Sequence, residues 1–380
     1  MQDASKHYIN GQWVASIDGR EMAVENPSTE EKIATITLGG VADADAAVAA
    51  AKAAFPAWAA TDPLDRIAAL ERLMEVYKGQ AEDMAQAISF EMGAPIALAR
   101  TAQVGAGAGH LKNTIRTAKG FAFERPLGDH APCDMILYEP VGVCALITPW
   151  NWPMNQVMLK VAPALAAGCT MVLKPAEQAP LSAMLLAEMI DAAGFPPGVF
   201  NLVNGDGAGV GAHLTAHPDV NMVSFTGSTR AGVAISKAAA DTVKRVSLEL
   251  GGKGANIIFA DADEKAVTRG VRHCFNNSGQ SCNAPTRMLV ERSVYDQAIE
   301  TARAVAEKTE VGPADIEGRQ IGPVVSETQF NKIQYLIKRG IDEHATLIAG
   351  GLGRPDGLNR GHFVRPTIFA DVTLEMTIWK

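Results

Sequence analysis

The sequence predicts an α/β fold built around a parallel sheet, and three observations support this. From Val141 onward, short apolar or β-branched runs alternate with helical stretches, which is typical of strands joined by crossover helices. These runs are almost continuously apolar, as expected of parallel strands that are covered on both faces. The chain has 380 residues, enough for two domains at about 150 residues each or for one large domain with an insert.

The part of the chain before the sheet is predicted to be largely helical. Residues 42–59 and 64–88 are rich in Ala, Leu and Glu, and their apolar residues recur at helical spacing. Pro56, Pro63 and Pro95 punctuate this region. After it, residues 121–140 carry Pro and Gly breaks around two short extended pieces, which predicts a hairpin that projects from the core. We regard this hairpin as a candidate interface.

The strands of the sheet are predicted from apolar runs in the second half of the chain. The runs in order are 143–148, 170–174, 199–203, 221–225, 245–250 and 256–259. Helical stretches separate them, as at 181–193 and 230–240. A GGKG turn follows Leu250 and opens a second β/α section with a further strand at 287–290. The predicted organisation is one domain from 1–120 and 141–250, a hairpin at 121–140, and a second domain at 251–380.

Composition excludes several functional classes. Lys and Arg number 34 against 42 Asp and Glu, a net charge of −8 without any basic block, so a nucleic-acid partner is not expected. The N-terminus lacks the basic and apolar regions of a secretory signal. The most apolar stretch, Val157 to Leu173, is interrupted by Lys160, Pro163 and Gly168, so no membrane span is expected.

The cysteine content points to a reducing compartment. Five cysteines without a CxxC pair fit neither a disulfide framework nor a zinc ribbon, so we expect a cytoplasmic protein. His213 and His217 have the i, i+4 spacing of a metal-binding helix. Leu214 stands where a metalloprotease motif needs Glu, and Pro218 ends the helix, so no metal site is expected.

Three segments are candidates for nucleotide binding, since parallel sheets bind ligands at the carboxyl ends of their strands. GDGAGVG at 205–211 departs from the dinucleotide fingerprint because Val210 replaces its third Gly. FTGSTRAG at 225–232 follows an apolar strand and opens a helix whose N-terminus suits a pyrophosphate, although an ordinary strand-to-helix turn has the same pattern. Lys174 and Glu177 end another strand and suit ribose hydroxyls, or are two solvated loop charges.

A candidate nucleophile and a candidate base lie further along the chain. Small and polar residues flank Cys282 in NNSGQSCNAP, which predicts a turn with exposed backbone N–H groups rather than the buried environment common for free cysteine. No His lies in that segment. Glu249 ends an apolar strand beside two glycines, where partial burial suits a general base, and the alternative is a surface carboxylate at a strand end.

Taken together, these motifs resemble those of the aldehyde dehydrogenase superfamily. The resemblance runs along almost the whole chain, with the motifs in the family's order. They are ITPWNWP at 147–153, LKPAE at 173–177, FTGSTRAG at 225–232, LELGGK at 248–253 and GQSC at 279–282. The resemblance implies a Rossmann-type NAD-binding domain, a second α/β catalytic domain, and an oligomerisation hairpin in a homodimer or homotetramer.

The resemblance also implies a reaction, the oxidation of an aldehyde to a carboxylic acid with NAD. Cys282 would attack the aldehyde to give a thiohemiacetal, and Asn151 with the Cys282 backbone N–H would hold the oxyanion. Glu249 would activate the water that hydrolyses the thioester, which argues against the CoA-acylating branch. Lys174 completes the catalytic set that we expect.

Cofactor and substrate residues follow from the same resemblance. Glu177 would repel a 2′-phosphate, so NAD is favoured, with NADP possible. The expected cofactor residues are Ile147, Thr148, Pro149, Trp150, Lys174, Glu177, Gly207, Gly211, Phe225, Thr226, Gly227, Ser228, Leu250 and Gly251. The expected substrate pocket suits a medium-sized aldehyde and comprises Trp152, Gln156, Leu159, Ser281 and Asn283.

The resemblance weakens at the end of the chain. Residues 375–378 follow the family's pattern, but Trp379 and Lys380 stand where a further Glu- and Phe-containing motif is expected. We therefore expect a C-terminally incomplete catalytic domain with an unpaired strand edge. The alternative function is a nucleotide-binding protein without dehydrogenase activity, with at most a Cys282-dependent esterase activity.

Overall fold

The computed structural model describes residues 4–380, and these residues form two compact units. The first unit comprises the chain up to Val24, Ala34–Ala87 and Arg100–Leu250. The second comprises Glu25–Ile33, Ile88–Ala99 and Gly251–Lys380. Backbone hydrogen bonds tie the two early segments into the second unit: His362 donates to Pro27 at 2.9 Å, and Ile96 donates to the carbonyl of Ala314 at 2.7 Å.

The sheet of unit 1 confirms the predicted parallel α/β core. Its order is β11-β10-β7-β8-β9-β1-β2, parallel from β11 to β9, with β1 antiparallel to both β9 and β2. Every residue of the inner strands β7, β8 and β9 is buried, which explains their apolar sequences. The bounds are β1 Lys6–Ile9, β2 Gln12–Ala15, β7 Val143–Ile147, β8 Thr170–Lys174, β9 Phe200–Leu202, β10 Met222–Gly227 and β11 Arg245–Leu250.

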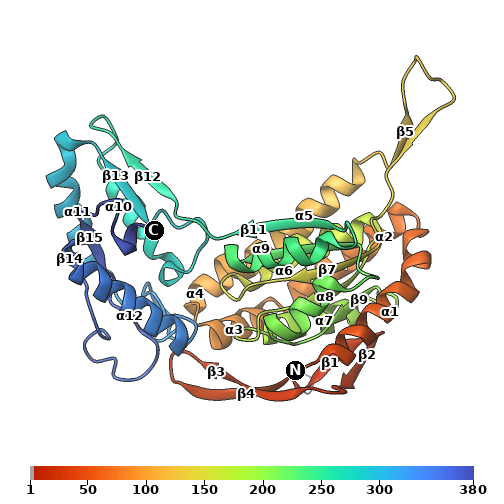
Figure 1. Cartoon of the computed structure of the whole chain (residues 1–380), viewed down its shortest axis with the longest axis horizontal. Coiled ribbons are helices and arrows are strands. Elements are labelled where there is room, and N and C mark those ends of the chain that lie inside the picture. Colours follow the sequence, from red (N-terminus) through yellow and green to blue (C-terminus); the bar gives the residue numbers. More distant parts are fainter. Residues whose placement is uncertain (1–3) are drawn as a thin grey trace. The chain divides into compact units, whose positions relative to one another are not determined.

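Helices cover both faces of this sheet (Figure 1). On one face, α1 and α8 pack with α9 in a core of small and branched side chains, including Ala47, Val172 and Ile235. On the other face, α6 and α7 contact the strands, and α2 and α5 pack behind α6. The bounds are α1 Val41–Ala59, α2 Pro63–Gly79, α5 Val104–Lys119, α6 Pro153–Ala167, α7 Leu181–Ala192, α8 Ala212–Ala216 and α9 Thr229–Ala240.

The predicted helical character of residues 64–88 is confirmed, and the structure divides this region into two helices. The first, α2, ends at Gly79, and α3 runs over Ala81–Met92. Gly79 is a poor helix former, and the backbone of Gln80 leaves helical geometry with ψ at 21°, so α2 ends here and α3 starts anew. A short α-helix, α4 (Ile96–Leu98), and a short π-helix, η1 (Ala99–Gln103), follow.

The predicted hairpin is confirmed. Strands β5 (Glu124–Pro126) and β6 (Met135–Leu137) pair antiparallel, and Leu127 donates a backbone hydrogen bond to Asp134 at 2.9 Å. Met135 and Leu137 are more than half exposed, at 53% and 57%. Figure 1 shows the hairpin reaching well beyond the helices of unit 1. Its role in assembly stays a prediction.

Unit 2 is a smaller α/β assembly of two-stranded sheets. The parallel pair is β12 with β13, and the antiparallel pair is β14 with β15. The predicted strands at 256–259 and 287–290 are confirmed within one residue. The bounds are β12 Ala255–Ile258, β13 Arg287–Val290, β14 Thr346–Ala349, β15 Ile368–Ala370, α10 Ala266–Phe275, α11 Tyr295–Glu307 and α12 Glu327–Asp342.

Short elements complete the chain. Strands β3 (Arg20–Asn26) and β4 (Glu31–Leu38) form a pair whose turn belongs to unit 2. The remaining short helical turns are η2 Gly207–Gly211, η3 Asn276–Gly279, η4 Arg292–Val294 and η5 Thr377–Trp379. Within residues 4–380, no helix has both the length and the apolar character needed to cross a membrane.

Candidate active site

In unit 1, the parallel register brings three predicted cofactor residues into one row. Ile147 at the end of β7 lies opposite Lys174 of β8 and opposite Phe225 of β10. The segment from Thr148 to Trp152 then leaves the carboxyl end of β7 and leads into α6. The Thr148 backbone N–H donates to the Lys174 carbonyl at 3.2 Å. The row therefore lies at the carboxyl ends of the parallel strands, where α/β proteins bind ligands.

Lys174 is a buried cation, not a solvated loop charge. Its side chain is 3% exposed, and Nζ donates to the carbonyls of Pro175 at 2.8 Å and Gly205 at 2.6 Å. Glu177 lies 3.4 Å from the same nitrogen and is partly exposed. Burial lowers the pKa of Lys174, while the negative charge of Glu177 acts in the opposite direction. For Lys174, the solvated alternative is thus wrong.

The glycine-rich segment after β9 forms a short turn against Lys174. Asp206 caps it by accepting the Gly209 N–H at 2.5 Å. A Cβ added at Gly211 would lie 3.6 Å from Cδ of Lys174, so this glycine is in ordinary contact distance of the lysine stem. Val210, which departs from the dinucleotide fingerprint, is fully buried in the core. The substitution therefore has a packing reason.

The strand-to-helix turn after β10 has the features of an anion site. Ser228 is the N-cap of α9, and its Oγ accepts the Ala231 N–H at 3.3 Å. Gly227 and Ser228 are accessible. The hydroxyls of Thr226 and Thr148 are buried at the ends of neighbouring strands and have no hydrogen-bond partner among the described residues. Buried polar groups normally have partners, so these two fit a polar ligand such as a dinucleotide.

Glu249 lies on β11, the edge strand of the sheet, in register with Thr226 of β10. It is exposed, so the predicted partial burial is wrong, because an edge strand has a neighbour on one side alone. Lys160 of α6 lies within its electrostatic range. Lys160 is 5% exposed and donates to Oγ of Ser224 at 3.1 Å. Burial lowers the pKa of Lys160 to about 8, and the charge of Glu249 opposes this shift.

Sequence reasoning missed Lys160. In the sequence, this lysine stands out only as an interruption of an apolar stretch. That interruption could have indicated a site residue, because a cation on the buried face of an apolar helix needs a polar partner. Lys160 is therefore an additional candidate site residue.

The predicted oxyanion and substrate residues lie at the start of α6. The carbonyl of Asn151 accepts a hydrogen bond from Gln103 Nε2 at 3.3 Å, which links the loop to the end of η1. Asn151, Trp152 and Leu159 are half-buried, and Gln156 is 5% exposed. Pro153 at the first helical position fixes where the helix begins. These side chains belong to unit 1.

In unit 2, Cys282 lies on a tightly constrained turn. The preceding residues Asn277, Ser278 and Gly279 all have positive φ, at 51°, 57° and 75°. Two non-glycine residues in this region mark strain, which clusters at functional sites. Ser278 Oγ donates to the Gly322 carbonyl at 2.7 Å, and Gln280 Oε1 accepts the Val325 N–H at 2.9 Å. These bonds hold the turn against residues 322–325.

The accessibility of the thiols separates Cys282 from most other cysteines. Cys144 and Cys169 are buried, and burial raises the pKa of the half-buried Cys274 to about 11. Among the described residues, Cys282 and Cys133 are the exposed thiols. Ser281 is half-buried and Asn283 is exposed on either side of Cys282. The predicted turn is confirmed, with Ala284 N–H donating to the Ser281 carbonyl at 3.1 Å.

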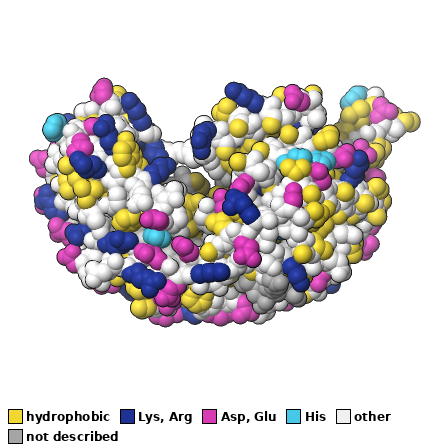
Figure 2. All heavy atoms as spheres, turned by 60° about the horizontal axis from the view of Figure 1, so that its bottom comes forward, with side chains coloured by type: hydrophobic (Ala, Val, Ile, Leu, Met, Phe, Trp, Pro, Cys, Tyr) yellow, Lys and Arg dark blue, Asp and Glu magenta, His cyan; other side chains and the backbone are white. Residues whose placement is uncertain are grey.

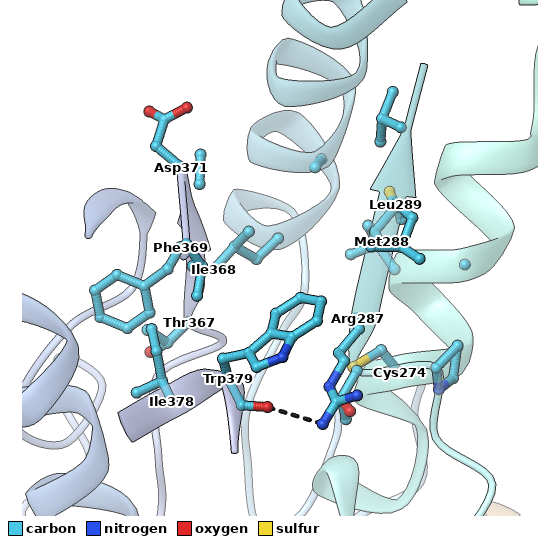
Figure 3. Close-up of a pocket in the computed structure, with 18 of the residues that line it drawn as sticks. Cys274, Arg287, Met288, Leu289, Thr367, Ile368, Phe369, Asp371, Ile378 and Trp379 are labelled. Carbon is cyan, nitrogen blue, oxygen red and sulfur yellow. Dashed lines mark hydrogen bonds between the residues drawn. The ribbon is translucent and has the colours of Figure 1, made fainter. Parts of the chain in front are cut away.

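A separate cavity of about 470 Å³ lies within unit 2, between β13 and β15. Figure 3 shows Arg287 and Trp379 facing each other in it. The guanidinium of Arg287 lies 4.6 Å from the Trp379 ring centroid and donates to the Trp379 carbonyl at 2.8 Å. None of the predicted site residues lines this cavity.

The predicted site residues are thus distributed over both units. Asn151, Lys174 and Glu249 belong to unit 1, and Cys282 belongs to unit 2. The profile of the aldehyde dehydrogenase family matches residues 13–380. The chain belongs to the aldehyde dehydrogenase family. The predicted fold class and family are confirmed.

Relatives and solved structures are similar to this chain over its whole length. A 3-succinoylsemialdehyde-pyridine dehydrogenase from Pseudomonas sp. is 52% identical, and the alignment covers 100% of this chain and 79% of the relative. An aldehyde dehydrogenase structure from Bartonella henselae is 59% identical with a TM-score of 0.98, covering 100% of this chain and 79% of that one. A Pseudomonas syringae aldehyde dehydrogenase C variant, solved with NAD⁺ and octanal, is 47% identical with a TM-score of 0.97, covering 100% and 77%.

Proposed function

We propose that this chain oxidises an aldehyde to a carboxylic acid with NAD, through covalent intermediates on Cys282. The observation that carries the proposal is the exposed Cys282 thiol on a strained, hydrogen-bonded turn, in a member of the aldehyde dehydrogenase family. The residues of unit 1 supply the cofactor and base functions. The NAD-bound neighbours support the choice of cofactor.

The first step belongs to Cys282 and the oxyanion donors. The Cys282 thiolate attacks the carbonyl carbon of the aldehyde and forms a thiohemiacetal. The negative charge on the oxygen is held by the Asn151 side-chain amide and the Cys282 backbone N–H. Such donors act where charge develops, and removing one reduces kcat by about 10²–10³ in comparable sites. NAD, when bound, supplies the acceptor for the hydride that leaves the former carbonyl carbon.

The second step is hydrolysis of the Cys282 thioester. Glu249 takes a proton from water as the water attacks the acyl carbon, and the C–S bond breaks to release the carboxylate and the thiol. An exposed carboxylate on an edge strand has access to water. The buried side chain of Lys160, which donates to Ser224, lies within electrostatic range of Glu249.

The cofactor is proposed to bind at the carboxyl ends of the strands of unit 1. Lys174 and Glu177 hold the ribose hydroxyls, and the N-terminus of α9 at Ser228 receives the pyrophosphate. The buried hydroxyls of Thr148 and Thr226 gain partners in this arrangement. Glu177 repels a 2′-phosphate, so NAD is preferred over NADP.

The substrate is proposed to be a medium-sized aldehyde. Trp152, Gln156 and Leu159 combine an aromatic, a polar and an aliphatic side chain on α6 and the turn before it. Two relatives are named for or solved with aldehydes of this size, a pyridyl semialdehyde and octanal. We further propose a homo-oligomer assembled through the hairpin, and a cytoplasmic location, which rests on the five unpaired cysteines.

Trapping the acyl intermediate tests this proposal. The protein is incubated with NAD and an aldehyde such as octanal, quenched with acid and digested, and the Cys282 peptide is analysed by mass spectrometry. We expect an acyl adduct on Cys282 that forms only when NAD is present. An adduct on another residue, or turnover with Cys282 replaced by Ala, overturns the assignment.

A further inference from the structure

We infer that Asp45, His213 and His217 form a binding site for a divalent transition-metal ion of the zinc type, separate from the predicted catalytic residues. This departs from the expectation of no metal site at the two histidines, because the fold brings Asp45 beside them. His213 lies on α8 and His217 directly follows it, whereas Asp45 lies on α1. Among the described residues, these three form the cluster whose ligand atoms lie within 4.8 Å of one another. Figure 2 shows histidine side chains gathered at one place on the surface.

The geometry suits a three-ligand site. The i, i+4 spacing puts both imidazoles on one side of α8, with ring centroids 5.5 Å apart and ring planes at 90°. Oδ1 of Asp45 lies 2.5 Å from Nε2 of His213 and 3.3 Å from Nε2 of His217. A tetrahedral zinc ion with bonds of about 2.0–2.1 Å holds its ligands roughly 3.3 Å apart, so His213 and Asp45 must separate slightly.

The chemistry of the ligands selects the ion. Two imidazoles and one carboxylate suit Zn²⁺, Ni²⁺ and Cu²⁺, whereas Mg²⁺ and Ca²⁺ require oxygen ligands. Imidazole must be neutral to bind a metal, and burial lowers the pKa of His217, with the charge of Asp45 acting in the opposite direction. The side chains of His213 and Asp45 are 28% and 50% exposed, so an ion can reach them from solvent.

One hydrogen bond limits the affinity. The Asp219 backbone N–H donates to Nδ1 of His217 at 3.1 Å, which places the ring hydrogen on Nε2. A metal on Nε2 moves that hydrogen to Nδ1, so the bond to Asp219 must open. The charges around His217 nearly cancel. Lys52 pairs with Asp219 at 2.7 Å, and the positive charge of Lys244, which donates to the His217 carbonyl, is offset by the carboxylate of Asp45. We therefore expect a dissociation constant on the order of 1–10 μM for Zn²⁺, weaker than that of a closed structural site.

The test is Zn²⁺ binding to the chelator-treated full chain, measured by isothermal titration calorimetry and by thermal unfolding. We expect one site of this affinity and a rise in Tm of about 3–6 °C at a Zn²⁺ concentration near 100 times the dissociation constant. Mg²⁺ at the same concentration is expected to produce neither effect. Because thiols also bind Zn²⁺, the assignment depends on the variants and not on binding alone.

The variants are His213→Ala and Asp45→Asn, both at accessible positions that leave the core intact. The matched control is His273→Ala, an exposed histidine on α10 outside the cluster. We expect the first two to weaken the site at least tenfold and the control to leave it unchanged. If His213→Ala and Asp45→Asn bind Zn²⁺ as tightly as the parent chain does, the inference is wrong. Equal Tm values without metal show that the variants are folded.

Discussion

At the scale of single residues, Glu249 is the proposed base for hydrolysis of the thioester, as opposed to acyl transfer to another acceptor. Glu249→Gln keeps the shape of the side chain but removes its basicity. We expect the steady-state rate to fall by about 10²–10⁴ and the Cys282 thioester to accumulate. Mass spectrometry of the acid-quenched protein measures the adduct directly.

The control for this substitution is Glu264→Gln, which changes an exposed glutamate of unit 2 that has no proposed role. It is expected to leave both the rate and the adduct level unchanged. Normal turnover by Glu249→Gln without any acyl adduct would show that another group activates the water.

Lys160 gives a prediction about stability and pH. Its pKa in the folded protein is about 8, below the ordinary value of 10.5, so burial of its charge destabilises the fold at neutral pH. Between these two values the unfolded chain binds more protons, so the free energy of unfolding rises with pH as this penalty disappears. Lys160→Met is expected to stabilise the protein by up to about 3 kcal/mol near pH 7, and the gain should vanish above about pH 10.5.

Chemical denaturation at about pH 7 and about pH 10 measures this difference. Lys237→Met, at an exposed position of α9, is the control and is expected to change the free energy of unfolding by less than about 0.5 kcal/mol. A stabilisation by Lys160→Met that is equal at both pH values would mean that packing, not charge, is responsible.

The sequence predicts Cys282 and Glu249 as site residues but not Lys160, for a physical reason. Cys282 lies in a run of small polar residues, a local signal that survives without a structure. The environment of Lys160 is formed by Ser224 and Glu249, which lie on the neighbouring strands β10 and β11. These two residues come together only through the pairing of the strands. The exposure of Glu249 likewise follows from β11 being the edge strand, which the order of the strands decides.

At the scale of elements, two serine N-caps allow an effect on stability to be distinguished from an effect on cofactor binding. Ser228 caps α9 and Ser326 caps α12, and each hydroxyl accepts a backbone N–H at 3.3 Å. Replacing either serine by Ala is expected to reduce the free energy of unfolding by about 1 kcal/mol. Ser228 also borders the proposed pyrophosphate position, whereas Ser326 belongs to unit 2.

We therefore expect Ser228→Ala to weaken NAD binding several-fold and Ser326→Ala to leave it unchanged. Titration of NAD, followed by quenching of tryptophan fluorescence, measures the affinity of both variants. Equal affinities in the two variants would argue against the N-terminus of α9 as the pyrophosphate site.

The strands were predictable because buried parallel strands have a strong local signature. β7, β8 and β11 begin and end within one residue of the predicted runs. The break between α2 and α3 was not predicted, since Gly79 and Gln80 lie within an otherwise continuous helical pattern. Single glycines are tolerated in helices, so packing decides whether the helix ends.

At the scale of the whole molecule, the hairpin of β5 and β6 projects from unit 1 and exposes large apolar side chains (Figure 1). Phe121, Leu137 and Tyr138 expose 43%, 57% and 46% of their surface. Apolar surface of this kind usually marks an interface. Leu137→Lys is expected to shift the assembly to a smaller species, measured by light scattering after size-exclusion chromatography.

The control is Leu374→Lys, at a leucine of unit 2 that is 65% exposed. It is expected to leave the molar mass unchanged. Assembly of Leu137→Lys identical to that of the parent chain would exclude the hairpin as the main contact.

The division into units was only partly predictable from the sequence. The change of unit after Leu250 coincides with the GGKG turn, a local feature. Residues 25–33 and 88–99 group with unit 2 because of contacts such as Ser28 Oγ accepting the Ala314 N–H at 3.1 Å. Contacts between such distant segments leave no local pattern.

The chain is proposed to oxidise aldehydes through a covalent adduct on Cys282, with NAD as the hydride acceptor. The most direct measurement is the formation of NADH across a panel of aliphatic, aromatic and semialdehyde substrates by the parent chain, Cys282→Ala and Cys133→Ala. We predict NADH formation by the parent chain and Cys133→Ala, and a loss of at least about a thousandfold in Cys282→Ala. NADH formation that persists in Cys282→Ala, or its absence from a folded parent chain that binds NAD, would contradict the account.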